Sequence, residues 1–293
     1  LDSTGELMLY NGAVDIGQGS TTIIAQICAD GLGLPVARMK QVVGDTDLTP
    51  DAGKTSASRQ TFVSGKAAQL AGEDLRQNIL RHANAGPESK IELTGSIITV
   101  RDGAERHQID LSALSAGSDG AVLEGNGTFD PPTVPLDENG QGSPYATYGF
   151  AAQIATVEVD MELGTTKVLK ITAAHDVGRA INPIQVEGQV QGGIAQGLGF
   201  ALMEEYVPER SDNLHDYLIP TIGDMPEIEV LVVEEEEPLG PYGAKGVGEP
   251  GLIPTAPAIF SAIRHAAGIR LTRAPALPHR VRAAILSQAQ DSD

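Results

Sequence analysis

Four short stretches of the sequence combine glycines with polar side chains that could bind a ligand or move a proton. The first is Gly17-Gln18-Gly19-Ser20, between a strand pattern and a helix pattern. Exposed N–H groups at a helix start attract anions, so this stretch could hold a phosphate. A tight strand-to-helix connection is the alternative. The third glycine and the downstream acid of a dinucleotide-binding Rossmann fingerprint are missing.

The second stretch, residues 55–61, gathers small hydroxyl residues around Arg59 and Gln60 just before a helix pattern. One interpretation is local, with Ser58 or Thr61 capping the helix. The other is functional, with Arg59 making a charge-assisted contact to a phosphate inside a polar cradle. The sequence leaves both open.

The third stretch is a predicted helix over residues 185–205 that carries five glycines, at 188, 192, 193, 197 and 199. Glycine weakens a helix, so we interpret these positions as making room for something pressed against it. Gln191 and Gln196 could then donate a hydrogen bond to an oxo group of a ligand. Packing alone also explains the apolar stripe, which consists of Val186, Val190, Ile194, Leu198 and Leu202.

The fourth stretch, Gly246-Val247-Gly248-Glu249-Pro250, places one carboxylate between small residues and a proline. Glu249 could cap a helix predicted from about Pro254. Alternatively it is a general base whose pKa is raised by an apolar, water-poor pocket. The histidines lack metal-ligand spacing, so His175 is interpreted as structural, and no serine has the surroundings of a hydrolase nucleophile.

The elements around these stretches predict an α+β fold with two sub-domains, residues 1–150 and 151–293. One hairpin is expected from strands 91–100 and 106–111 around Asp102-Gly103. Another is expected over 151–174, turning at Leu163-Gly164. The acidic run 234–237 is expected to be a solvated edge. The other predicted strands cover 7–14, 39–43 and 228–233, and the other predicted helices cover about 23–33, 62–82, 254–267 and 278–290.

Composition limits the classes of function. A formal charge of −19 argues against nucleic-acid binding and suits a soluble cytoplasmic or a salt-adapted protein. A phosphate-bearing cofactor would therefore be held mainly by backbone N–H groups. The single cysteine, Cys28, excludes a disulfide framework, a zinc knuckle and an iron–sulfur cluster within this chain. Neither a membrane span nor a signal peptide is expected.

In order and spacing, these stretches resemble the C-terminal half of the molybdopterin-binding subunit of the xanthine dehydrogenase and aldehyde oxidoreductase family. The resemblance implies that Glu249 is the catalytic base and that Gln196 and Gly248 lie near the cofactor. It further implies that a row of residues lines the pterin, its pyrophosphate and the dinucleotide, namely Gly17, Gln18, Gly19, Ala57, Ser58, Arg59, Gln60 and Thr61. The matching stretches are 15–19, 56–60, 175–178 with Asn182-Pro183, 186–199 and 246–249.

The resemblance also implies cofactors and partners. The cofactor would be molybdopterin, in its cytosine dinucleotide form, with molybdenum held through the pterin and without a direct protein ligand. Iron–sulfur clusters and FAD would reside on partner subunits. Family subunits are more than twice this length, so an N-terminal-half molybdopterin subunit is expected as a further partner. This split is similar to the medium molybdopterin subunit of nicotinate dehydrogenase, and a fragment of a longer chain is the alternative.

The implied reaction is hydroxylation of an N-heteroaromatic substrate, such as nicotinate, at an electron-poor carbon. Oxidation of an aldehyde or of a purine such as xanthine at the same type of site is one alternative. A non-catalytic subunit that only helps to hold the cofactor is another.

Overall fold

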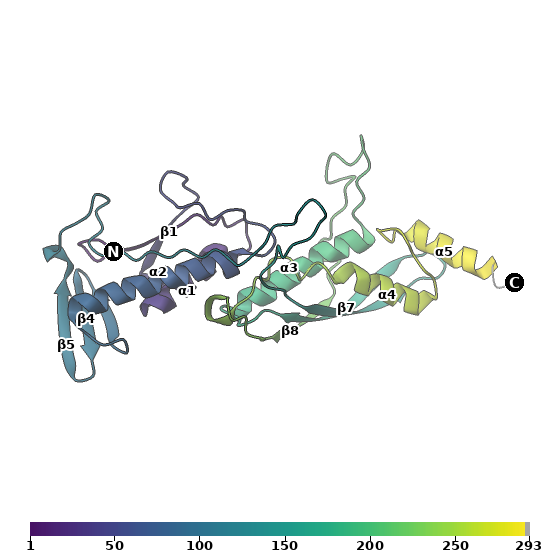
Figure 1. The fold of residues 1–293 in the computed structure, drawn as a ribbon. Coiled ribbons are helices and arrows are strands. Elements are labelled where there is room, and N and C mark those ends of the chain that lie inside the picture. Colours follow the sequence, from purple (N-terminus) through teal and green to yellow (C-terminus); the bar gives the residue numbers. More distant parts are fainter. Residues whose placement is uncertain (291–293) are drawn as a thin grey trace. The chain divides into compact units, whose positions relative to one another are not determined.

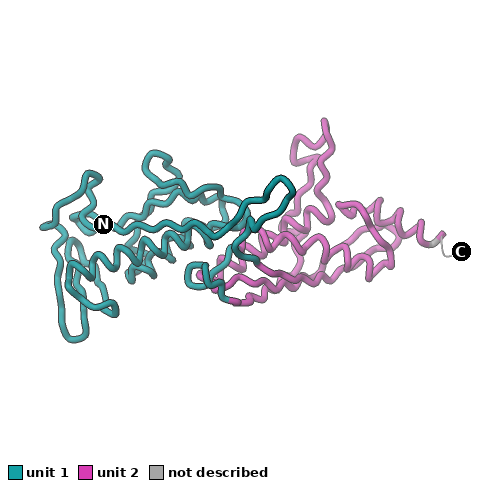
Figure 2. Tube along the Cα trace, in the orientation of Figure 1, with its two compact units in different colours: residues 1–148, 236–246 teal, residues 149–235, 247–293 magenta. Residues whose placement is uncertain are grey.

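The computed structural model describes residues 1–290 and shows two compact units, which Figure 2 draws in different colours. Unit 1 contains Leu1–Tyr148 and Glu236–Gly246, and unit 2 contains Gly149–Glu235 and the chain from Val247 onward. Each unit combines helices with sheets, which confirms the predicted α+β class. The segment 236–246 thus belongs to the first unit although it lies late in the sequence.

In unit 1, strands β1 (Leu7–Asn11) and β2 (Met39–Val43) form a parallel two-stranded sheet (Figure 1). Helix α1 (Ser20–Leu32) connects them, and α2 (Gln60–Ala83) packs along α1. Helix α1 ends at Gly33, whose φ of +82° is a left-handed conformation that glycine adopts without strain. Its N–H donates to Ala29 O at 2.8 Å, which confirms the predicted stop.

The rest of unit 1 contains an antiparallel sheet of β3 (Lys90–Thr94), β4 (Ile97–Asp102) and β5 (Glu105–Asp110). The prediction of one strand over residues 91–100 is wrong, because a turn at Gly95 divides it into β3 and β4. Gly95 has a φ of +56°, which permits this tight reversal. The sheet packs on α2 through a fully apolar core that includes Ile79, Ile98 and Leu111.

Unit 2 is built on a three-stranded sheet of β6 (Ala151–Val159), β7 (Thr166–Asp176) and β8 (Glu227–Val233). The predicted β6–β7 hairpin is confirmed, with Gly164 at φ +74° in its turn, and β8 runs parallel to β7. Helices α3 (Pro183–Leu202) and α4 (Thr255–Ala267) pack on one face of the sheet, and α5 (Pro278–Gln290) follows. Their shared core contains Ile171, Ile194 and Ile259, all fully buried.

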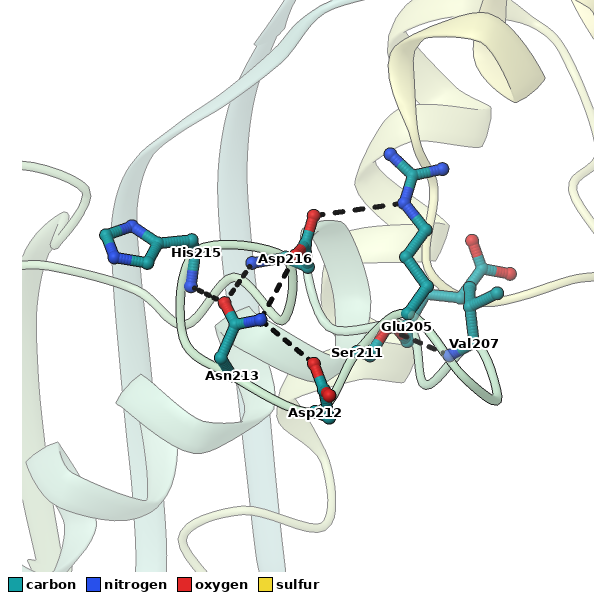
Figure 3. A network of polar contacts seen from close by, with 8 residues as sticks. Glu205, Val207, Ser211, Asp212, Asn213, His215 and Asp216 are labelled. Atoms are coloured by element: carbon teal, nitrogen blue, oxygen red, sulfur yellow. Dashed lines mark hydrogen bonds and ion pairs between the residues drawn. The ribbon is translucent and has the colours of Figure 1, made fainter.

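The loop after α3 is ordered by hydrogen bonds around Asn213 (Figure 3). Its Oδ1 accepts from the N–H of His215 at 2.8 Å, and its Nδ2 donates to Asp212 Oδ1 at 2.9 Å. The hydroxyl of Ser211 donates to Glu205 O at 3.2 Å and ties the loop back to the end of α3. Glu205 also forms ion pairs with Arg273 and Arg280, and these bonds fix the exit of α3.

The longest helix, α2, has 24 residues and includes charged side chains such as Glu73, Asp74 and Arg76. Charged groups in the middle of a helix oppose its insertion into lipid. Within residues 1–290, no helix combines the length and apolar character that crossing a membrane requires.

Candidate functional site

The turn between β1 and α1 is organised by the carboxylate of Asp15. It accepts the N–H groups of Gly17 at 2.8 Å, Gly19 at 3.3 Å and Thr21 at 3.0 Å. Burial alone would raise the pKa of Asp15, but these amide hydrogen bonds together lower it. The carboxylate therefore occupies amides that the sequence analysis expected to be offered to an anion.

Gly17 still presents a surface to a ligand. It is exposed, its φ is +106°, and a Cβ placed on it would meet no atom within 4 Å. The neighbouring Gln18 is bonded to its own turn: its Oε1 accepts from Ile16 N at 2.7 Å, and its Nε2 donates to Val14 O at 3.2 Å. The turn is rigid and open on the side of Gly17, a shape that admits close approach of a flat group.

The second stretch does not cap α2 as one alternative supposed. The N-cap residue is Arg59, and no side-chain hydrogen bond caps the helix, so capping by Ser58 or Thr61 is wrong. The reason is local, because Ala57 and Ser58 both have a φ of +53° and delay the helix start until Gln60. Ala57 is exposed and Ser58 is half-buried, while Thr61 lies in the first turn of the helix.

Arg59 and Gln60 both bind the loop in front of them. Arg59 Nη1 donates to Ala52 O at 2.8 Å and to Lys54 O at 3.1 Å. Gln60 is buried, and its Nε2 donates to Lys54 O at 3.2 Å and to Thr55 Oγ1 at 3.0 Å. Both side chains thus fix the shape of residues 52–59. Contact of Arg59 with a phosphate stays a prediction.

One acceptor joins the first two stretches within unit 1. Thr55 Oγ1 donates to Val14 O at 3.1 Å, and Gln18 Nε2 donates to the same oxygen. Gly246 also belongs to this cluster, since a Cβ on it would lie 1.5 Å from Ser58 O. Three segments that are far apart in the sequence are therefore brought together in unit 1.

In unit 2 the glycines of α3 divide into two groups. Gly193 and Gly197 face this chain, because a Cβ at either would lie 2.7 Å or less from Gly251 or Thr255. Gly188 and Gly192 face open space and would meet no atom within 4 Å. Gln196, one turn beyond Gly192, is exposed, as is Gln191. The predicted room for something pressed against α3 is therefore filled partly by this chain and partly left open.

Glu249 lies in a turn that packs on α3. Leu252 N donates to Glu249 O at 3.0 Å, and Gly251 fits against the backbone of Gly193. Helix α4 begins only at Thr255, with Pro254 as its N-cap and no acidic residue in its first turn. Glu249 is therefore not at a capping position, which removes the local alternative. Glu249 and Gly248 are both exposed, so unit 2 by itself does not enclose this carboxylate in the apolar pocket that the sequence analysis expected.

Two polar side chains, the buried Thr255 and the half-buried Gln153, hold that turn. Thr255 Oγ1 donates to Gln153 Oε1 at 2.7 Å and also lies 3.0 Å from Gly251 O. Gln153 Nε2 donates to Gly251 O at 2.9 Å and lies 3.4 Å from His175 Nε2. His175 is buried, and burial lowers its pKa, so the imidazole is neutral at physiological pH. Its position in the sheet fits the structural interpretation.

The two units thus carry two kinds of surface. Unit 1 has an exposed turn at Gly17 and a loop whose carbonyls are bonded by Arg59. Unit 2 has the carboxylate of Glu249, together with the exposed glycines and glutamine amides of α3. Such surfaces suit a flat, polar, phosphate-bearing molecule, since glycines admit close approach and amides bind oxo groups. Among the described residues, His, Cys, Asp and Glu form no group of three that could hold a metal ion.

Sequence reasoning assigned no role to Asp15, Gln153 or Thr255. Asp15 had a readable signal, because an aspartate two residues before a glycine commonly accepts that glycine's N–H in a turn. The pair of Gln153 and Thr255 had none, since the two residues are 102 positions apart and meet only through packing of β6 on α4.

Comparison with known proteins gives a consistent result. The family model of the molybdopterin cofactor-binding domain matches residues 1–226. The putative xanthine dehydrogenase molybdenum-binding subunit of Escherichia coli K12 is 32% identical over 96% of this chain and 38% of its own length. The nicotine 6-hydroxylase large subunit of Paenarthrobacter nicotinovorans is 31% identical, over 96% of this chain and 35% of its own.

Among solved structures, aldehyde oxidoreductase from Desulfovibrio gigas has the same fold, with a TM-score of 0.80 and 29% identity. The match covers 95% of this chain and 29% of that protein. This chain therefore spans well under half the length of the relatives it matches.

Proposed function

Because the chain belongs to the molybdopterin-binding subunits of the xanthine dehydrogenase and aldehyde oxidoreductase family, we propose that it supplies the base, Glu249, and part of the cofactor cradle of a multi-subunit molybdenum hydroxylase. One observation carries this proposal. The contact between Gly193 and Gly251 seats the Glu249 turn on the helix that bears the open glycines and Gln196. A subunit that only held the cofactor would have no need of this positioned carboxylate.

Each unit, taken by itself, carries residues that suit the cofactor. The open faces of Gly17, Gly188 and Gly192 admit close approach of a flat pterin, and Gln196 has an exposed amide that can bind its oxygen atoms. Arg59, braced by the carbonyls of its own loop, supplies a positive charge for the pyrophosphate. We assign the cytosine dinucleotide form, which the Ser58-Arg59-Gln60 version of the loop favours. When bound, the group accepts the electrons that the substrate loses.

The work of the protein is to orient the reactants and move a proton. The carboxylate of Glu249 accepts a proton from the water-derived oxygen that is inserted into the substrate. The tight turn from Glu249 to Leu252 and the bonds of Thr255 fix where that carboxylate can reach. Enclosure of the exposed carboxylate then comes from the partner chain that completes the site.

The substrate we propose is an N-heteroaromatic ring such as nicotinate, oxidised at an electron-poor carbon. Similarity to a nicotine hydroxylase subunit supports this class, while similarity to an aldehyde oxidoreductase keeps aldehydes as the second candidate. The assembled enzyme would include an N-terminal-half molybdopterin subunit, an iron–sulfur subunit and a FAD subunit. Turnover of nicotinate, an aldehyde and xanthine by the purified complex separates the substrate classes.

The decisive variant is Glu249→Gln in the assembled complex. It removes the proton acceptor and keeps the size of the side chain, so turnover should fall by about 10²- to 10⁴-fold while molybdenum stays bound. Glu235→Gln is the matched control, because Glu235 is also exposed and lies in the same unit. Retention of wild-type turnover by Glu249→Gln would overturn the assignment of the base. Absence of both molybdenum and a cytosine nucleotide from the denatured complex would overturn the cofactor assignment.

A further inference from the structure

The turn that carries Glu249 is fastened at Gly251. This glycine is buried, and one of its sides lies against the backbone of α3. A Cβ on Gly251 would be 3.0 Å from the Cα of Val190 and 3.2 Å from the carbonyl oxygen of Gln189. Leu252 N donates to Glu249 O at 3.0 Å and closes the turn. The position of Gly251 therefore helps to set where the carboxylate of Glu249 can reach.

The carbonyl of Gly251 is held from the other side by two side chains. Gln153 reaches it from β6, 98 positions away in the sequence, with Nε2 at 2.9 Å from the oxygen. Thr255 Oγ1 lies 3.0 Å from the same oxygen. Gly251 is thus fixed between the backbone of α3 and the side chains of Gln153 and Thr255.

The chemistry of the donors and acceptors determines how the amide of Gln153 is oriented. A carbonyl oxygen only accepts hydrogen bonds, so the Gln153 atom beside Gly251 O must be the nitrogen. The amide oxygen then lies 2.7 Å from Thr255 Oγ1 and takes the one proton of that hydroxyl. The bond to Gly251 O is therefore made mainly by Gln153.

The second proton of the Gln153 amide faces His175. The amide nitrogen lies 3.4 Å from His175 Nε2. In the β6–β7 pair, Gln153 is opposite Ala173 and Ala151 is opposite His175, so Gln153 and His175 are diagonal neighbours. Long side chains reach each other across such a diagonal. Because the amide nitrogen is a donor, His175 Nε2 must be the acceptor.

This contact selects one form of the imidazole. With Nε2 as an acceptor, His175 is neutral and carries its proton on Nδ1. A proton on Nε2 would place two donors against each other. His175 is 1% exposed, and its Nδ1 has no hydrogen-bond partner among the described residues, so the choice of tautomer depends on Nε2. Burial lowers the pKa of His175, in agreement with a neutral ring.

We propose that Gln153 is the positioning residue for the base: its amide holds the carbonyl of Gly251, and with it the Glu249 turn, in an orientation that the neutral imidazole of His175 maintains. This inference rests on the proposed function, which assigns Glu249 as the base. Gln153 acts through Gly251 and takes no proton in the reaction.

The primary variant is Gln153→Met in the assembled complex. Methionine keeps the length of the side chain and removes the amide, so the turn loses its bond to β6. The kcat per bound molybdenum should fall by about 10- to 100-fold, while KM changes by less than about threefold. Gln77→Met is the matched control, because Gln77 is exposed on α2, and it should keep the wild-type kcat. Wild-type kcat in Gln153→Met would overturn the proposal.

Two further variants separate positioning from stability and from size. Ile171→Val removes one methyl group from the core of the same sheet and should lower Tm without lowering kcat. If it lowers kcat as far as Gln153→Met does, the loss is an effect of stability and the proposal fails. Gln153→Glu keeps the length and an acceptor but has no donor for Gly251 O. Its kcat should fall as in Gln153→Met, and wild-type kcat would refute a role for the donor.

Hydrogen exchange, resolved to single residues, reads the turn without reference to turnover. In Gln153→Met the amide of Leu252, which donates to Glu249 O, should exchange about tenfold faster than in the wild-type complex. The amides of the β3–β5 sheet in unit 1 should exchange at the same rate in both proteins. Unchanged exchange at Leu252 would contradict the proposal.

The role of His175 is tested by a double-mutant cycle. His175→Leu keeps a similar volume and removes the acceptor, so kcat should fall by about threefold, less than in Gln153→Met. The double variant should be no worse than Gln153→Met alone, because His175 acts through Gln153. Additive losses would break this link. Neutron diffraction from the wild-type complex needs no variant: deuterium on Nδ1 is expected, and deuterium on Nε2 would refute the orientation of the amide.

Glu249→Gln, measured beside these variants, distinguishes the two proposals. Wild-type turnover in Glu249→Gln removes the base, whatever the Gln153 variants show. Loss of turnover in Glu249→Gln together with wild-type kcat in Gln153→Met leaves the base in place and removes the positioning role alone.

Discussion

Replacing Gly193 with alanine would place a methyl group between α3 and the turn that carries Glu249. The added Cβ would lie 2.7 Å from Gly251 C and from Leu252 N, whereas ordinary contacts begin at 3.4 Å. The turn therefore has to move by about 0.7 Å, because both neighbouring atoms belong to backbone. This substitution displaces the turn that carries Glu249 and leaves the carboxylate itself unchanged.

Gly192→Ala is the matched control, one position away on the same helix. A Cβ on Gly192 would meet no atom, so this variant adds helix preference without a clash. Its free energy of unfolding should rise by about 0.5–1 kcal/mol. Gly193→Ala has the same gain but also an overpacking cost of about 1–3 kcal/mol, for a net loss of up to about 2.5 kcal/mol. The two variants should then differ by about 2 kcal/mol, or roughly 4–8 °C in Tm.

Calorimetry of the purified assembly measures this difference, and steady-state kinetics measures the displacement of the base. A shift of this size in a catalytic group should reduce kcat by about 10- to 100-fold in Gly193→Ala. Gly192→Ala should keep its gain in stability. Because its open face is proposed to receive the pterin, the variant should lose molybdenum content, so kcat is compared per bound molybdenum. Equal Tm and equal kcat for the two variants would refute the reasoning that the Gly193–Gly251 contact seats Glu249.

Two further predictions follow from the polar contacts of the two units. Asp15 has a lowered pKa in the fold, so its contribution is complete above its usual pKa of about 3.9 and is lost as the pH falls through the lower folded value. The wild-type protein should therefore lose stability below about pH 4, and Asp15→Asn should abolish the part of that loss that Asp15 causes. Chemical denaturation at several pH values measures the free energy of unfolding, and the same pH profile in both proteins would contradict the prediction. Thr255→Val removes a hydroxyl bonded to Gln153 and Gly251 and should lower the free energy of unfolding by about 1–3 kcal/mol. Thr255→Ser keeps the donor and should lower it less. Equal losses for the two variants in thermal denaturation would contradict a role for the hydrogen bonds.

Much of the secondary structure could be predicted from the spacing of apolar residues and from the glycines at the ends of elements. Strand β2 lies where the sequence predicts it, over Met39–Val43, and the stop of α1 at Gly33 was readable because a glycine follows the last apolar position. The strand predicted over residues 91–100 was wrong, because Gly95 reverses the chain there and a lone glycine also occurs inside strands.

Two interpretations of the candidate site changed for local geometric reasons. Consecutive left-handed residues at Ala57 and Ser58 move the helix start past both predicted caps. Helix α4 begins beyond the reach of Glu249, which removes capping as its role. Neither the left-handed backbone nor the helix start can be read from residue types, since alanine and serine rarely adopt such angles.

The sequence by itself determined which residues could do chemistry: Glu249 between glycines, Gln196 on a glycine-rich helix, and Arg59 in a loop of small hydroxyl residues. Only the tertiary structure decided which glycines of α3 face this chain and which remain open, because helix periodicity places Gly192 and Gly193 side by side with no sign of what covers each. It also decided that segment 236–246 belongs to unit 1. These features depend on contacts between segments far apart in the chain, and the spacing of residues in the sequence does not predict such contacts.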